Sequence, residues 1–575
     1  MEFLTAYIAP IIFIAMVLFL LFGYPVAFAL AANGVFFGLV GIELGLLQPS
    51  LFGAMPERIF GVMGNDTLLA IPFFTLMGLI LERSGMAEDL LDTIGQLFGP
   101  VRGGLAFAVI FVGALLAATT GVVAASVISM GLISLPIMLR YGYDRRVASG
   151  VIAASGTLAQ IIPPSLVLII MADQLGRSVG DMYSGAFIPG FVLTGLYTGY
   201  IVLVAIFKPN FVPALPPEAR VFREPNGKTG GTSLLVLTAV SIACAVAFGK
   251  RLPADTATDE MIVLCMMVGI GVAFVAAMAN KLFKIGLLSA MAERVTFVLI
   301  PPLALIFLVL GTIFLGVATP TEGGAMGASG ALAMALARKR LNLTLLKQAM
   351  NSTLKLTSFV VFILVGARVF SLTFYGVDGH KWVEHLLLDL PGGQLGFLIV
   401  VNIMVFLLAF FLDFFELSFI VVPLLGPVAE KLGIDLIWFG VLLGVNMQTS
   451  FMHPPFGFAL FYLRSVAPAK EYVDKVTGKK TDPVTTMQIY WGAVPFVVIQ
   501  MIMIGLVIAF PQMVTMGLDK PVEVDLDKVE INIPGGDFQA PSFEPPTAPG
   551  QAGAAEEDPN KAIMDALKKE GADAK

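Results

Sequence analysis

The sequence predicts an all-α polytopic membrane protein built from two inverted copies of one helical unit. Of its 575 residues, 57% are hydrophobic and 13% are charged, whereas soluble domains carry about a quarter charged residues. Apolar stretches long enough to cross the hydrocarbon core recur along the chain, among them residues 6–22, 184–207, 232–249, 261–279, 296–318 and 486–510. In addition, one spacing of prolines and aspartates occurs twice. Most of the chain is therefore expected to lie in lipid.

Composition and motifs exclude several other classes of protein. The basic residues fall in short connecting segments rather than in a stripe, so we expect no nucleic-acid partner. The two cysteines, Cys244 and Cys265, lie in predicted spans, and the three histidines show no metal-site spacing. Since GxSxG, HExxH and phosphate-binding glycine loops are absent, we expect no enzyme activity, no cofactor and no transition metal. The first apolar stretch lacks a basic flank and a cleavage site, so we expect it to be retained.

The repeated spacing divides the chain into two copies. Eight residues separate the first proline from the aspartate and 19 separate the aspartate from the proline pair, in both Pro136, Asp144, Pro163-Pro164 and Pro427, Asp435, Pro454-Pro455. Such self-similarity predicts two structurally related units. We place the first repeat at residues 1–207 and the second at 296–515.

Each repeat is predicted to contain a re-entrant hairpin followed by a discontinuous helix. These elements are assigned to 103–140 and 146–172 in the first repeat, and to 397–430 and 436–463 in the second. The intervening residues 208–295 are interpreted as an inserted loop with two extra transmembrane helices. Residues 516–575 are rich in proline, glycine and acidic residues, and they predict a disordered acidic tail.

Basic residues predict the orientation of the chain, because cytoplasmic loops are enriched in Lys and Arg. If both hairpins are re-entrant, one set of loops carries 22 Lys and Arg residues and the opposite set carries 6. The first set is then cytoplasmic, both termini are periplasmic and the two repeats are inverted. Ordinary spanning pairs in place of the hairpins would leave the same charge pattern, so it is the polar hairpin tips that favour re-entrance.

Polar segments interrupt four apolar runs at membrane depth. They are Ala118–Gly121 and Ser155–Ser165 in the first repeat, and Asp413–Ser418 and Asn446–Pro455 in the second. Helix breaks within a bilayer persist only where they face protein or a water-filled cavity. Their half-helix ends offer free N–H groups to anions and free carbonyls to cations. The four breaks therefore predict binding sites.

Hydroxyl side chains within these breaks could complete an oxygen cage around a hard monovalent cation. The candidates are Thr119, Thr120, Ser155, Thr157, Thr449 and Ser450. The alternative for each is structural, because Ser and Thr in membrane helices often bond to their own backbone or join helices together.

Four charged residues also lie in or beside apolar runs: Glu322, Arg368, Asp413 and Glu416. Placing such a group at mid-helix costs about 2.5–3.5 kcal/mol, so each is a functional candidate. Arg368 can hold a carboxylate through two parallel hydrogen bonds; the competing interpretation is an internal salt bridge to Glu322 or Asp413. His453, beside the second proline pair, fits either a neutral structural hydrogen bond or a proton-linked role.

Four motifs resemble the large membrane subunit of tripartite ATP-independent periplasmic (TRAP) transporters, the DctM-like permease. They are GNDTLLAIPFFTLMG at 64–78, YGYDRRVASGVIAASGTLAQIIPPS at 141–165, GVATPTEGGAMGA at 316–328, and GID at 433–435 followed by HPPFGFALF at 453–461. The resemblance covers nearly all of residues 1–515. It implies an elevator-type, sodium-driven importer of the bacterial inner membrane.

The resemblance also implies partners and a substrate class. The family works with a small four-helix membrane subunit and a periplasmic binding protein that delivers an organic acid anion. The inserted helices and long tail resemble the longer branch of the family, which implies a 2-oxo or 2-hydroxy carboxylate or a related acid. Two alternatives remain open: an ion-coupled carboxylate transporter of another family that acts without a binding protein, and a channel.

Site residues follow from the same resemblance. The first sodium site is expected at Thr119, Gly121, Ser155, Thr157 and Pro163, and the second at Asp413, Thr449, Ser450, His453 and Pro454. Substrate is expected between these sites, near Thr120, Thr319, Thr321 and Arg368. The family usually has Thr where His453 stands, so the ligand set of the second site departs from the family pattern.

Overall fold

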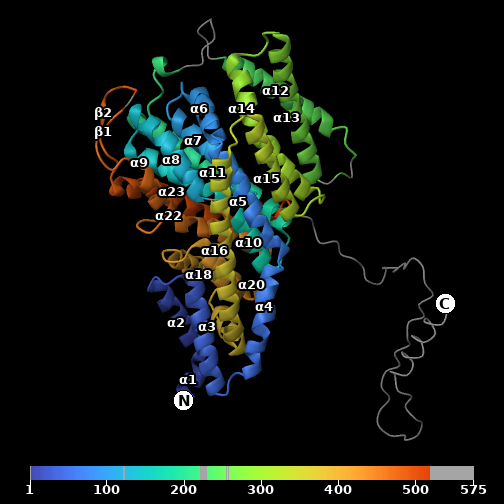
Figure 1. Ribbon diagram of the computed structural model, residues 1–575, viewed down its shortest axis with the longest axis vertical. Helices are drawn as coiled ribbons and strands as arrows, with labels where there is room; N and C mark the ends of the chain where they lie inside the picture. The colour runs from blue at the N-terminus through green and yellow to red at the C-terminus, as the bar shows by residue number, and fades with distance from the viewer. Residues whose placement is uncertain are drawn as a thin grey trace, which may run out of the picture. The chain divides into compact units, whose positions relative to one another are not determined.

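The computed structural model describes residues 2–120, 123–220, 230–253, 256, 258–474 and 476–518, and it is almost entirely helical (Figure 1). The predicted tail lies outside the described residues from 519 onward. By length and composition, the described residues contain 8 helices able to cross a membrane, or up to 10 if each of two bent helix pairs forms one span. The chain is thus an all-helical polytopic membrane protein with bent helix pairs, as predicted.

The elements follow one another with short connections. The first part of the chain contains α1 (Glu2–Ala6), α2 (Ile8–Leu21), α3 (Val26–Glu43), η1 (Pro49–Ala54), α4 (Met55–Met63), η2 (Asp66–Leu69), α5 (Ala70–Arg83) and α6 (Met86–Phe98). Next come α7 (Gly104–Thr120), α8 (Val123–Arg140), α9 (Arg145–Thr157), η3 (Leu158–Gln160), α10 (Leu166–Leu175), α11 (Val179–Phe207), η4 (Pro209–Phe211) and η5 (Pro217–Ala219).

The central helices are α12 (Gly231–Gly249), α13 (Thr258–Phe283), α14 (Ala290–Phe314), α15 (Pro320–Ala337), α16 (Leu343–Gly376) and α17 (Gly379–Leu388). The last part contains α18 (Gly393–Leu408), α19 (Phe414–Ile420), α20 (Val422–Lys431), α21 (Leu436–Met447), η6 (Gln448–Phe451), α22 (Phe458–Val466), β1 (Tyr472–Val473), β2 (Lys480–Thr481), α23 (Thr486–Ala509) and α24 (Gln512–Thr515).

Segments 145–175 and 436–466 have the same local conformation. Gly142 and Gly433 precede them with φ of 82° and 71°, in the left-handed region that closes the previous helix without a Cβ clash. Asp144 and Asp435 then cap α9 and α21 by accepting hydrogen bonds from backbone N–H groups of the first turn. Each helix tightens into a 3-10 turn and ends before a cis Pro-Pro bond. The repeated sequence spacing thus corresponds to repeated backbone geometry.

The broken helix of each half packs against helices of the other half. Helix α9 packs against α22 and α23, whereas α21 packs against α10 and α11. In Figure 1, the blue-green helices α8 and α9 accordingly lie beside the orange helices α22 and α23. The α9–α23 crossing is close because two glycines meet there: a Cβ on Gly150 would lie 2.1 Å from the Gly492 carbonyl oxygen.

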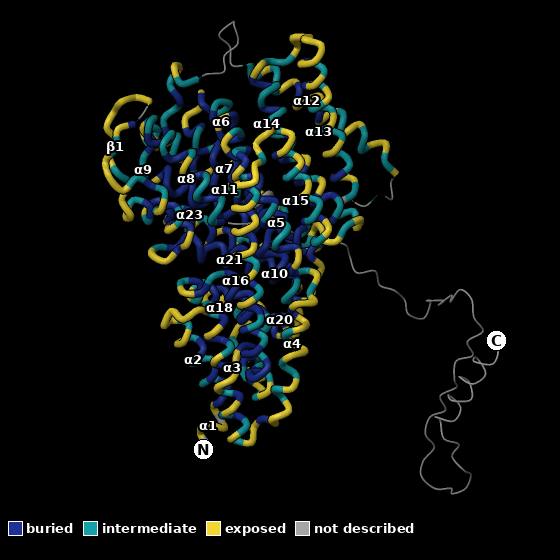
Figure 2. Tube along the Cα trace, viewed as in Figure 1, coloured by how far each residue is buried: buried dark blue, intermediate teal, exposed yellow. Residues whose placement is uncertain are grey.

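We name two groups of helices. The frame comprises α3, α5, α14, α15 and α16, in which α16 packs on α3 and α5, and α15 packs on α5 and α14. The core group comprises α7–α10 and α18–α22, which hold all four predicted breaks. Buried residues concentrate in α10 and α21 near the centre (Figure 2). The groups meet where α5 contacts α7 and where α16 contacts α19.

The fold departs from the sequence prediction in two details. A two-stranded antiparallel ribbon, β1 with β2, was not expected; it pairs Tyr472 with Thr481 and lies in the polar connection between α22 and α23. The second hairpin contains three helices, because its returning arm is divided: α19 starts at Phe414 behind an Asp413 cap and ends at Ile420, and α20 begins at Val422. The inserted region does contain two long helices, α12 and α13.

Candidate functional site

We call Ser155–Ser165, at the end of α9, the first break, and Asn446–Pro455, at the end of α21, the second break. The first break is buried throughout. Ser155 and Thr157 are fully buried, and their hydroxyls donate to the carbonyls of Ile152 at 3.1 Å and Ala154 at 2.8 Å. These bonds are the structural role weighed above, but each hydroxyl oxygen still has lone pairs for a cation. Pro163 follows at the start of the cis Pro-Pro bond.

The second break has the same chemistry. Thr449 and Ser450 are buried, and their hydroxyls donate to the carbonyls of Asn446 at 2.7 Å and Met447 at 2.6 Å. Pro454 lies in the second cis Pro-Pro bond. Both breaks therefore present hydroxyl oxygens whose protons already have acceptors, an arrangement that leaves only lone pairs available to a ligand.

Each hairpin lies beside the break of its own half. In the first half, a Cβ on Gly113 of α7 would lie 2.5 Å from the Ser155 Cβ, and one on Gly156 would lie 2.3 Å from a methyl group of Val127 in α8. Thr119 and Thr120 are the last residues of α7, whereas Gly121 lies outside the described residues.

In the second half, the hairpin contacts its break through side chains. The Asn446 Nδ2 group donates to both the carbonyl and the Oδ1 atom of Asn402 at 2.8 Å. The Ser418 hydroxyl donates to the Phe414 carbonyl at 2.6 Å and lies 3.7 Å from the Met447 sulfur. In both halves, the helices of the hairpin therefore contact the segment around the break.

Asp413 and Glu416 form a capping box at the start of α19. The Asp413 side chain accepts from the Glu416 N–H at 3.0 Å, and the Glu416 carboxylate accepts from the Asp413 N–H at 3.0 Å. A carboxylate favours the positive end of a helix. The second tip therefore carries acidic groups, which the hydroxyls of the first tip do not supply.

Arg368 is half-buried in α16 and forms no ion pair within the described part of the chain. Of the two predicted salt-bridge partners, Glu322 bonds to Thr319 in a second capping box and Asp413 bonds to Glu416. The internal salt bridge weighed against ligand binding is therefore not formed. A half-buried guanidinium without a partner is the strongest anion-binding candidate in the frame.

Thr319 and Thr321 are used structurally. Thr319 caps α15, and the Thr321 hydroxyl donates to the Asp66 carbonyl at 2.6 Å, which ties α15 to η2. No hydrogen bond among the described residues joins either threonine to Arg368. Their assignment to a substrate site stays a prediction.

His453 lies in an aromatic setting. Its ring stacks on Phe410 with centroids 4.0 Å apart and meets the edge of Phe406 at 5.1 Å. Neither ring nitrogen has a hydrogen-bond partner among the described residues, although the residue is only 2% exposed. The structural hydrogen bond proposed for His453 is therefore absent from this geometry, and both nitrogens stay open to a ligand.

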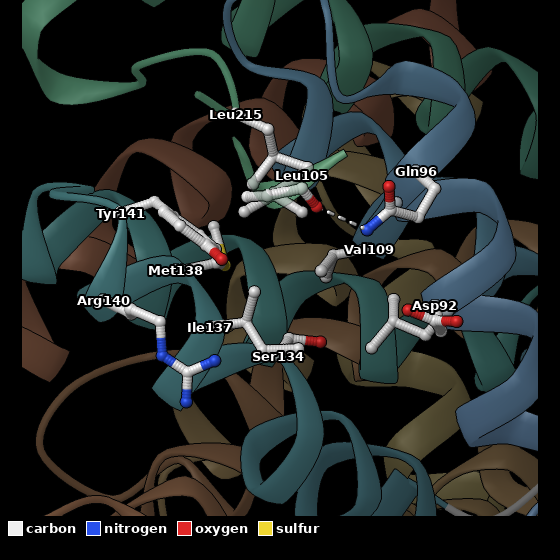
Figure 3. Close-up of a pocket in the computed structure, with 13 residues that line it drawn as sticks. Asp92, Gln96, Leu105, Val109, Ser134, Ile137, Met138, Arg140, Tyr141 and Leu215 are labelled. Carbon is white, nitrogen blue, oxygen red and sulfur yellow. Dashed lines mark hydrogen bonds between the residues drawn. The ribbon is translucent and has the colours of Figure 1, made fainter. Parts of the chain in front are cut away.

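A separate cavity of about 190 Å³ lies between α6, α7, α8 and the segment following η4 (Figure 3). Gln96 crosses it to donate to the Ala219 carbonyl at 3.1 Å, and the buried Ser134 hydroxyl has no partner among the described residues. At its rim, the Arg140 Nε donates to the Asp474 carboxylate at 2.9 Å. The Thr477 N–H and Arg140 hold the pKa of Asp474 at about 2. None of the predicted site residues lines this cavity.

Sequence reasoning assigned no role to several buried amides. Gln160 follows Thr157 by one turn, is 1% exposed, and has no partner for either side-chain polar atom among the described residues. Gln448 donates to Thr157, and Gln500 donates to Tyr197. A search for amides within ten residues of each proline pair would have found Gln160 and Gln448.

This architecture defines a class, a multi-pass membrane protein with buried polar breaks in its core. The family model "Tripartite ATP-independent periplasmic transporter, DctM component" matches residues 13–513. The chain therefore belongs to the DctM family of TRAP transporter permeases and is a transport protein rather than an enzyme.

Curated relatives agree with this assignment. The C4-dicarboxylate TRAP transporter large permease protein DctM of Pseudomonas aeruginosa is 28% identical over 75% of this chain and 84% of its own length. The sialic acid TRAP transporter permease protein SiaT of Haemophilus influenzae is 24% identical over 81% of this chain and 62% of its own length. Among solved structures, the YdaH transporter of Alcanivorax borkumensis aligns over 80% of this chain and 88% of its own, with a TM-score of 0.43 and 14% identity.

We expect Asp413→Asn to raise the sodium concentration for half-maximal uptake at least about tenfold. This change corresponds to a loss of about 1.4 kcal/mol in the free energy of sodium binding. Asn is as good an N-cap as Asp, so α19 should persist while the charge is lost. Uptake by the complex in proteoliposomes, measured against sodium concentration, checks this. The control is Asp435→Asn, an exposed cap of α21, which should leave the sodium curve unchanged. An unchanged dependence of uptake on sodium in Asp413→Asn would show that Asp413 serves only as a helix cap.

Proposed function

We propose that this chain is the permease subunit that imports a small organic acid anion by sodium-coupled, elevator-type alternating access. The observation that supports it most is the pair of buried helix breaks with the same backbone geometry, each lined by hydroxyls that offer lone pairs. Sodium prefers oxygen ligands of this kind. Broken helices in repeated units are how secondary transporters build ion sites near mid-membrane.

Sodium ligands are proposed residue by residue. The first site would use Thr119, Gly121, Ser155, Thr157 and Pro163, and the second would use Asp413, Thr449, Ser450, His453 and Pro454. For Ser, Thr and Asp the side-chain oxygen is the ligand; for Gly and Pro it is the backbone carbonyl. His453 would contribute a neutral ring nitrogen, either directly or through a bound water.

The substrate is proposed to be a carboxylate held by Arg368. Two curated relatives are named for C4-dicarboxylate and for sialic acid, and a guanidinium binds a carboxylate with two parallel hydrogen bonds. We propose a 2-oxo or 2-hydroxy carboxylate or a related acid, with Thr120, Thr319 and Thr321 as further contacts. Since Arg368 belongs to the frame and the ion ligands to the core group, substrate would bind where α16 meets α19.

Movement is proposed to occur between the two groups of helices. The core group would move with its ions, while the frame stays fixed in the membrane, so Arg368 would contact the substrate in only one position of the core group. Few polar bonds join the groups in the described chain; one is the 3.3 Å bond from the Tyr375 hydroxyl in α16 to the Pro423 carbonyl in α20. A weakly bonded contact surface is what rigid-body sliding requires.

Partners and orientation follow from the family. A tripartite system implies two further components, for which we propose a small four-helix membrane subunit and a periplasmic binding protein that delivers the anion. We place the chain in a bacterial inner membrane with both termini periplasmic, on the strength of the Lys and Arg distribution.

Replacing sodium by choline should abolish uptake of substrate by proteoliposomes that contain the complete complex and its loaded binding protein. Transport would stop because the coupling ion, and with it the driving gradient, is removed. The measurement is radiolabelled uptake in sodium and in choline at equal ionic strength, with binding to the binding protein as a control. Uptake that continues undiminished in choline would refute sodium coupling.

Arg368→Ala should lower uptake at least about a hundredfold, because an unpaired carboxylate in a desolvated site costs about 3 kcal/mol. Arg368→Lys keeps the charge but lacks the planar guanidinium, so its uptake should lie between that of the wild type and that of Arg368→Ala. Uptake rates at equal amounts of assembled complex test this. Arg177→Ala is the matched control, since its ion pair with Glu430 is exposed at both ends and should contribute little. Full uptake by Arg368→Ala would exclude a substrate role.

A further inference from the structure

One buried hydrogen bond joins equivalent positions of the two halves. The Gln448 Nε2 donates to the Thr157 Oγ1 at 3.1 Å, across 291 residues. The same interval separates Asp435 from Asp144. Gln448 and Thr157 are both 0% exposed. A residue of the first break is therefore bonded directly to its counterpart in the second.

This bond locates the pair relative to the internal symmetry. If an approximate two-fold axis relates the halves, the distance between two counterparts is twice the distance of each from the axis. Side chains 3.1 Å apart therefore lie next to the axis. Thr157 ends α9, and Gln448 begins the 3-10 turn that contains Thr449 and Ser450. The bond thus connects the two breaks directly.

The hydrogen-bonding capacity of the Gln448 amide is partly open. The Thr157 hydroxyl donates to the Ala154 carbonyl and accepts from Gln448, and the Tyr197 hydroxyl also interacts with it. The Gln448 Oε1 atom is buried and has no hydrogen-bond partner among the described residues. Burying an acceptor without a partner is unfavourable, so this atom indicates a ligand or a water that completes it.

We propose that Gln448 is a positioning residue that couples the two cation sites, a role that rests on the sodium-coupled function proposed above. An ion at the second break orders the turn that carries Gln448. The ordered amide then holds the Thr157 oxygen in place, so an ion at the first break binds to a preformed ligand. Coupling through ordering is reciprocal, and the two ions bind cooperatively.

Another buried bond between the halves provides a comparison. The Thr373 Oγ1 donates to the Gly34 carbonyl at 2.7 Å, across 339 residues, and Thr373 is 0% exposed. This bond joins α16 to α3 and touches neither break. If a buried polar bond between the halves serves only to hold them together, Gln448 and Thr373 should behave alike.

The test titrates sodium chloride against choline chloride at constant ionic strength, with the purified full-length chain and its membrane partner in detergent, and follows the unfolding midpoint. For the wild type we expect a sodium-induced rise with a Hill coefficient of about 1.5 or more. Gln448→Met keeps the side-chain volume without the amide, and its coefficient should fall to about 1. Thr373→Val, which removes the hydroxyl at nearly constant volume, should keep the wild-type coefficient even if its midpoint without sodium falls.

Two outcomes overturn the coupling role alone: a wild-type coefficient in Gln448→Met, or an equal loss of cooperativity in Thr373→Val. A wild type without any sodium-induced rise refutes sodium binding itself, and so the proposed function with it. Should Gln448→Met fail to fold, Gln448→Leu likewise removes the donor N–H without adding an acid, and it too should titrate without cooperativity. Retained cooperativity in Gln448→Leu would contradict the proposal.

Discussion

The structure depends on one constraint: a backbone that leaves its helix inside hydrocarbon must be satisfied by protein or by a ligand. In the described chain, α9 and α21 each end in a largely buried break, and each break is shielded by other helices. Helix α9 packs on α22 and α23, and α21 packs on α10 and α11, so each broken helix of one half is covered by helices of the other. This packing places the polar groups of the breaks in the most buried part of the described chain.

Because the breaks are buried, their hydroxyls are constrained as well. Ser155, Thr157, Thr449 and Ser450 each donate to a carbonyl three residues earlier. This back-bonding leaves each oxygen as an acceptor and aims its lone pairs away from the helix. The structural and the functional interpretation of these hydroxyls are therefore compatible, since the structural bond sets the orientation that a cation ligand needs. The proposed coupling through Gln448 extends the same logic from one break to the other.

Much of this architecture could be predicted from the sequence. The spacing from Asp144 to Pro163 and from Asp435 to Pro454 located both broken helices, since a capping aspartate and a helix-breaking proline each have a fixed local meaning. The sequence could not reveal that Arg368 has no partner among the described residues, or that His453 is stacked on Phe410 and meets the edge of Phe406. Those facts depend on contacts between distant segments, whereas the capping box of Asp413 and Glu416 is a local pattern that the sequence already carries. For the same reason the sequence does not indicate a role for Gln448, because its bond to Thr157 joins residues that are 291 positions apart.

The central claim is that the two halves are inverted copies, which sets the sites face to face. Single cysteines at Arg146 and Glu430, two exposed residues that flank the α8–α9 and α20–α21 connections, test it most directly when Cys244 and Cys265 are replaced by alanine. In intact cells and inverted vesicles, a membrane-impermeant maleimide should reach Arg146→Cys from the cytoplasmic side and Glu430→Cys from the periplasmic side. Labelling of both positions from the same side would contradict the inverted arrangement.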